Sequence, residues 1–87
     1  MEKRVAVMSI IVEKNESVEK LNSILHDASQ FIIGRMGIPY REKNVSVISV
    51  VIDAPQNITA ALSGKIGNLS GVTVKTAYSN VLSDNYE

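Results

Sequence analysis

Two stretches decide the fold of this 87-residue chain: VAVMSIIV, Val5–Val12, and VSVISVVI, Val45–Ile52. Each is a run of apolar or small residues rich in β-branched side chains. Such a run is too short for a helix of ordinary length and is typical of a buried strand. Neither stretch alternates strictly between apolar and polar residues, as a sheet covered on one side should. We therefore expect two central strands whose reverse face is also too apolar to meet water.

Between these two strands the spacing of the apolar residues changes. Over residues 18–28 an apolar residue recurs every three or four positions, which predicts a helix, and Asn15 or Ser17 can cap its start. Residues 31–40 predict an edge strand, because its two glycines and one proline favour a bent or bulged strand. The polar residues 41–44 form the hairpin turn into the next strand.

After the second central strand the helical spacing returns. Pro55 suits the first turn of a helix, and residues 58–69 carry its apolar face. Gly71 is the expected left-handed cap at the end of that helix. Residues 72–78 form the last strand of the prediction.

The predicted order is therefore strand, helix, strand, strand, helix, strand. With right-handed crossovers this order gives an α+β, ferredoxin-like βαββαβ sandwich: a four-stranded antiparallel sheet with both helices on one face. The single domain spans residues 1–78, and residues 79–87 form a short polar C-terminal tail.

The two faces of the central strands differ in bulk. We expect the bulkier set to pack beneath the helices and the Val/Ser set to face a neighbouring subunit. An uncovered patch of this size exceeds the few hundred Å² that soluble monomers tolerate, so a dimer or tetramer packed through its sheets is preferred over a free monomer. The expected interface residues are Val5, Val7, Ser9, Ile11, Val45, Val47, Ser49 and Val51.

Composition excludes several kinds of chemistry. Nine basic residues balance nine acidic ones, so the electrostatic footprint of a nucleic-acid binder is missing. Without cysteine, the chain has no disulfide, zinc ribbon, iron–sulfur ligation or thiol catalysis. We expect no catalytic residue, cofactor or metal, although His26 could serve a metal shared across an oligomer axis. No apolar run reaches the roughly 18 residues that span a bilayer, so we expect a cytoplasmic protein that does not bind membranes.

Two segments carry unusual residues. Arg35 and Arg41 flank a bend; they can pair with a carboxylate across an interface, hold an anionic ligand, or be solvated charges that keep an edge strand from aggregating. Gly64 and Gly67 lie inside the second predicted helix, where glycine is unfavourable. They indicate either close packing of the helix on the sheet or close approach of a partner subunit or ligand. The candidates for a ligand or an interface are Arg35, Gly37, Arg41, Ser63, Gly64 and Lys65.

Two longer motifs resemble a known family. RMGIPYREKN, residues 35–44, and ALSGKIGNLSGVTVK, residues 61–75, are similar to the hairpin and to the second helix and last strand of the small regulators of the iron-only hydrogenase system. The likeness runs over residues 3–76. It implies an ACT-like fold, related in shape to the C-terminal domain of nickel-responsive repressors. It also implies an occurrence beside the maturation genes of iron-only hydrogenases.

The combined interpretation is a non-catalytic, homo-oligomeric ACT-like regulatory or sensor domain. It would act through protein contacts, with a hydrogenase-system protein as the partner that the resemblance implies, and a small ligand between subunits is left open. One alternative is a regulator that binds DNA directly, against which the neutral charge argues. The other is a small ferredoxin-like enzyme that uses the open face of its sheet.

Overall fold

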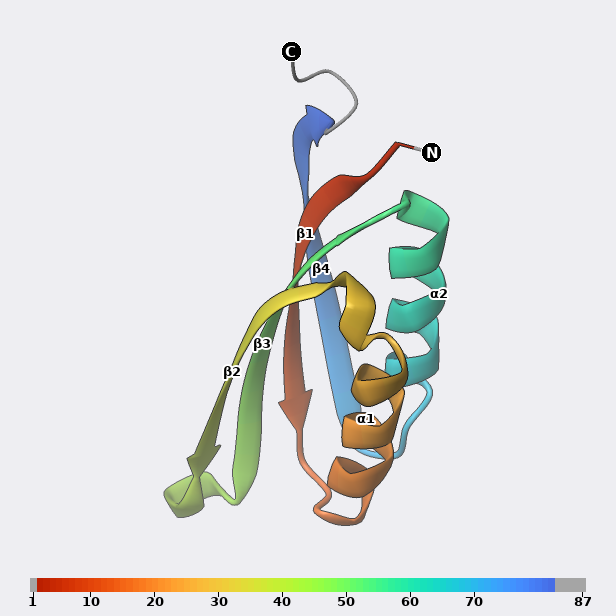
Figure 1. Ribbon diagram of the computed structural model, residues 1–87. Helices are drawn as coiled ribbons and strands as arrows, with labels where there is room; N and C mark the ends of the chain where they lie inside the picture. The colour runs from red at the N-terminus through yellow and green to blue at the C-terminus, as the bar shows by residue number, and fades with distance from the viewer. Residues whose placement is uncertain (1, 83–87) are drawn as a thin grey trace.

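The computed structural model describes residues 2–82 and confirms the predicted architecture. The four strands form one antiparallel sheet in the order β2-β3-β1-β4, and both helices cover the same side of it (Figure 1). This is the ferredoxin-like, ACT-like α+β arrangement, with β1 and β3 central. No helix in this part of the chain is long and apolar enough to cross a membrane. The elements are β1 Arg4–Val12, α1 Glu16–Asp27, β2 Ile32–Tyr40, β3 Val45–Ala54, α2 Gln56–Gly67 and β4 Val72–Leu82, with short 3-10 turns at Ser29–Phe31 and Arg41–Lys43.

The core lies between the sheet and the helices. β1 and β3 pair so that Met8 stands opposite Val50 and Ile10 opposite Ile48, and all four side chains are buried. The helices cover them with further buried residues, Leu21 and Leu25 from α1 and Leu62 and Ile66 from α2. Because side chains alternate along a strand, this register fixes the inner face of both central strands. The bulkier set does pack beneath the helices.

The start of α1 differs from the prediction that Asn15 or Ser17 caps it. Asn15 occupies the N-cap position, but its backbone is helical and its side chain forms no capping hydrogen bond. The Ser17 side chain is buried, and its hydroxyl donates to the carbonyl oxygen of Ser70 at 2.6 Å. A residue 53 positions away therefore takes the bond that local capping would have used. The contact ties the first turn of α1 to the loop before β4.

Gly71 adopts the expected left-handed conformation, with φ +70°, but it does not cap the helix. α2 already ends at Gly67, with Asn68 as its C-cap, so Gly71 instead turns the chain into β4. A Cβ at this position would lie 2.7 Å from Cγ of Lys14. The Glu13 N–H also donates to the Gly71 carbonyl oxygen at 2.7 Å. Both the backbone angle and the close approach of the loop after β1 require glycine here.

Three of the four strands differ in length or regularity from a simple antiparallel ladder of the predicted extent. β2 has a register shift between Ile32 and Gly34, as a glycine-containing edge strand was expected to have. The central strand β3 also runs two residues past the predicted end, to Ala54. β4 continues to Leu82 by pairing with Arg4 across a second register shift, so residues 79–82 belong to the sheet and not to the expected tail. Residues 83–87 of that tail lie outside the described residues.

Candidate functional site

The face of the sheet away from the helices consists of short cross-strand rows, which we call the open face. One row is Ile38, Val47, Ile11 and Thr73, taken from β2, β3, β1 and β4 in turn. The next row is Met36, Ser49, Ser9 and Lys75, and the third is Gly34, Val51, Val7 and Ala77. Val45 with Tyr40, and Val5 with Asp53, extend the face at its two ends.

This face leaves large apolar side chains in contact with solvent. In the single chain Met36 is 60% exposed, Ile38 50% and Val47 41%, and Ile11 and Val5 are also exposed. Within the three rows the one charged residue is Lys75, on the edge strand β4. The centre of the face holds Ser9 opposite Ser49, whose small side chains leave it flat. The face is therefore apolar, nearly uncharged and without a bulky obstacle at its middle.

All eight residues predicted to form a subunit interface lie on the open face. The cross-strand pairs set Val5 opposite Asp53, Val7 opposite Val51, Ser9 opposite Ser49 and Ile11 opposite Val47. Sequence reasoning missed the contribution of the edge strand β2, namely Met36, Ile38 and Tyr40. The signal was the alternation of these three residues with Gly37 and Pro39.

The six candidate ligand or interface residues do not form one site. Arg35 and Gly37 lie on β2, and Arg41 follows in the turn after it, whereas Ser63, Gly64 and Lys65 lie on α2. Arg35 stands opposite the buried Val50, so it projects to the helical side of the sheet. There its guanidinium donates a hydrogen bond of 2.5 Å to Oδ1 of Asn22 on α1. Arg41 lines a separate hollow around the hairpin, to which Arg35 does not contribute.

The α2 glycines do not pack closely on the sheet, so the first of the two interpretations offered for them was wrong. A Cβ added at Gly64 or Gly67 would meet nothing within 4 Å, because both positions face open space. The neighbouring Ser63 does contact the sheet, with its Oγ 3.1 Å from Oγ1 of Thr76 on β4. Ser63 is thereby assigned a structural contact, and Gly64 remains available to an approaching molecule.

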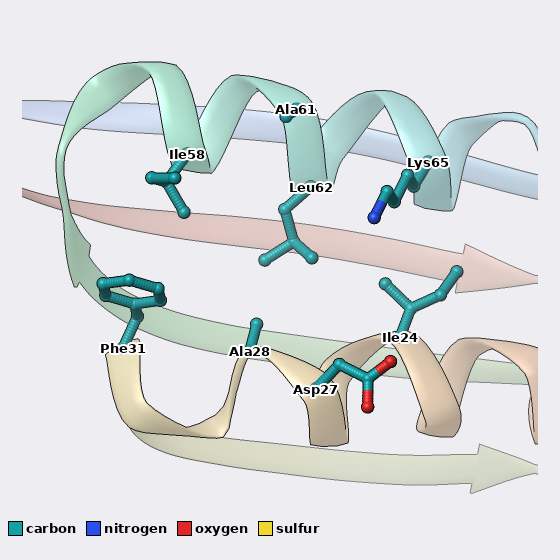
Figure 2. A pocket seen from close by; sticks show the side chains of 8 residues that line it. All are labelled: Ile24, Asp27, Ala28, Phe31, Ile58, Ala61, Leu62 and Lys65. Carbon is teal, nitrogen blue, oxygen red and sulfur yellow. The ribbon is translucent and has the colours of Figure 1, made fainter.

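Lys65 belongs to a groove between the two helices that sequence reasoning also missed. Figure 2 shows Asp27 of α1 and Lys65 of α2 on opposite sides of this groove, whose other lining residues are apolar. Its volume is about 230 Å³. The sequence signal was the i, i+4 spacing of two apolar pairs, Ile24 with Ala28 on α1 and Ile58 with Leu62 on α2. Each pair faces the other helix. The lining comprises Ile24, Asp27, Ala28, Phe31, Ile58, Ala61, Leu62 and Lys65.

The ionisable pair Tyr40 and Glu42 lies at the hairpin, where both side chains are exposed. The Tyr40 hydroxyl donates to Oε1 of Glu42 at 2.6 Å. This bond is the main reason that the pKa of Tyr40 is raised above its usual value, with a smaller contribution from desolvation. Within residues 2–82 no group of three or more His, Asp or Glu side chains could hold a metal ion, and His26 belongs to no such group.

Comparison with known proteins places the chain in a family. The model of the TM1266-like family, described as "Iron-only hydrogenase system regulator, putative", matches residues 4–76. The solved structure of the uncharacterized protein TM1266 from Thermotoga maritima is 38% identical, has a TM-score of 0.84, and the match covers 87% of this chain and 96% of that one. No curated protein sequence matches.

A more distant match shows the fold alone. A formyltetrahydrofolate deformylase from Pseudomonas putida is 11% identical, with a TM-score of 0.66 over 88% of this chain and 29% of that one. The family match covers most of the chain, from the first strand into the last, and the Thermotoga structure has the same fold over nearly its whole length. The chain therefore belongs to the TM1266-like family of the iron-only hydrogenase system.

Proposed function

We propose that the protein is a non-catalytic regulatory domain of the iron-only hydrogenase system that assembles with copies of itself through the open face. The observation that carries the proposal is the exposure of large apolar side chains on that face, namely Ile11, Met36, Ile38 and Val47, with Val5 and Tyr40 at its ends. The family description supports a regulatory role. Regulation would then proceed by protein contacts and not by chemistry on a substrate.

The shape of the open face suits a second copy of the same face. Two sheets pack about 10 Å apart when their facing side chains are small enough to interdigitate. Ser9 and Ser49 at the centre and valines around them meet that requirement. A two-fold axis brings identical surfaces together, and the three central rows carry one charged residue, Lys75, at their edge, so two copies of the face can pack together without placing a charge at the centre.

The size of the open face is also adequate. Four strands spaced about 4.8 Å apart, each with about nine residues at roughly 3.3 Å, cover a projected area on the order of 500 Å². A corrugated surface of that extent has an accessible area approaching the roughly 800 Å² that each partner contributes to a standard interface. The open face is thus large enough for a specific dimer, and its extent is comparable to the largest patches of soluble monomers, which often mark interaction sites.

Light scattering of the purified chain over a concentration series tests this proposal. We expect a mass of two or four chains at micromolar protein, falling towards one chain on dilution. Native mass spectrometry of the same samples gives the stoichiometry. A mass of one chain throughout the micromolar range would contradict the proposal, because the open face would then be stable in water.

A further inference from the structure

A groove runs between α1 and the edge strand β2, on the side of the sheet opposite the open face; we call it the edge groove. It consists of two hollows of about 430 and 240 Å³, which share Asn22 and Arg35 as lining residues. The Arg35–Asn22 hydrogen bond joins α1 to β2 at the boundary between them. The groove exists because β2 is poorly covered: its residues from Arg35 to Tyr40 are all exposed.

The larger hollow gathers hydrogen-bond donors and no acid. Arg35 from β2, Asn22 and His26 from α1, and Ser29 from the following turn all line it, and none of the residues lining either hollow is acidic. Asn22 uses its amide oxygen to accept from Arg35, so its NH₂ group remains a donor. The guanidinium is held at one nitrogen and keeps further N–H groups for a second partner.

The floor of the same hollow is apolar. Leu25 is buried beneath it, and Ile32 is half-buried at the start of β2. A ligand that suits this hollow needs an anionic group for the arginine and a short hydrocarbon part for the floor. A planar carboxylate matches the fork of a guanidinium, with two parallel N–H···O bonds.

We propose that the edge groove is a binding site for a small organic carboxylate with a short apolar chain. Arg35 holds the carboxylate, Asn22 fixes the guanidinium and donates to the ligand, His26 and Ser29 close the polar side, and Leu25 with Ile32 contacts the hydrocarbon part. The site is built within one chain, on the side of the sheet away from the open face. It therefore does not depend on the assembly proposed above.

NMR titration of the full chain with sodium butyrate tests the site directly. The sequence contains one histidine, so a single imidazole Hε1 resonance reports on the hollow. We expect this resonance to shift saturably at constant pH and ionic strength, with a dissociation constant of the order of millimolar for so small a ligand. Acetate should bind several-fold more weakly, since it lacks the methylenes that contact the floor. Butylammonium, which has the same chain and the opposite charge, should cause no saturable shift.

The matched variants are Arg35→Gln and Arg41→Gln, which remove the same charge from two exposed arginines. Arg35→Gln should weaken butyrate binding about tenfold or more, because a charge-assisted bond is lost. Arg41→Gln should bind as the unaltered chain does. Equal effects of the two variants, an equal response to butylammonium, or the lack of a saturable shift would overturn the site. Light scattering of Arg35→Gln should show the unaltered mass, so the site and the assembly fail or succeed independently.

Discussion

Replacing Val47 by lysine should separate the subunits of the proposed assembly without unfolding the chain. Val47 lies on the open face between Ile11 and Ile38, in the row next to the central serines, and is 41% exposed in the single chain. Full burial of a valine side chain is worth about 1.5–3 kcal/mol, so covering the exposed part contributes about 1 kcal/mol per copy and about 2 kcal/mol per two-fold dimer. Lysine forfeits that contribution and adds two unpaired charges to an apolar interface.

The expected loss is about 4 kcal/mol or more per dimer, which weakens the dissociation constant by about a thousandfold. In the separated chain the lysine can run along the sheet and reach water, so the free energy of unfolding of the monomer should change by no more than about 1 kcal/mol. Sedimentation equilibrium over a micromolar concentration series measures the first quantity. Thermal denaturation followed by circular dichroism under dissociating, dilute conditions measures the second.

Ala60→Lys is the matched control, because it adds the same charge at an exposed position of α2, on the other side of the sheet. It should leave the mass unchanged. The reasoning is refuted if Val47→Lys retains the unaltered mass at every concentration. It is equally refuted if Ala60→Lys dissociates the protein to the same extent, since a general charge effect would then explain both.

Three further predictions concern the folded chain itself. Gly71→Ala should lower the free energy of unfolding by about 1–2 kcal/mol, because the backbone at Gly71 is left-handed and an added Cβ would have no room. Gly64→Ala should instead raise the free energy of unfolding by about 0.5–1 kcal/mol, because Gly64 lies within a helix and faces open space. Denaturant titration measures both changes, and unfolding midpoints of the two variants that move in the same direction would contradict these two predictions. Ser17→Ala should cost about 1 kcal/mol by removing the 2.6 Å bond to the loop before β4, and an unchanged midpoint would show that water replaces the hydroxyl there. Because the folded-state pKa of Tyr40 is raised above 10.0, its contribution to stability is present below that pH and is lost as the pH rises through the raised value. Glu42→Gln should make Tyr40 ionise at lower pH in an ultraviolet titration, and an identical curve would rule out the hydrogen bond as the cause.

The open face shows how far sequence pattern reaches into function. Side chains alternate along every strand, so once Met8 and Ile10 are assigned to the core, Val7, Ser9 and Ile11 must point the other way. Every second residue of each apolar run faces the same side of the sheet, so the two runs predicted which side of each central strand would be open. The edge groove was only partly predicted: Arg35 and Gly37 were among the candidate ligand residues, but Asn22 and Ser29 were not.

The sequence by itself determined the order of the elements, the two central strands and the two faces of each, because these follow from spacing between neighbours along the chain. Only the tertiary structure decided which distant residues meet. It placed the Ser17 hydroxyl against the Ser70 carbonyl, left Gly64 in open space, and set Arg35 beside Asn22 of α1. It also extended β4 beyond the predicted end, because β1 offered Arg4 as a pairing partner. The physical reason is the same in each case: periodicity reports which side of an element is apolar, whereas the partner of a polar group depends on how the elements are packed.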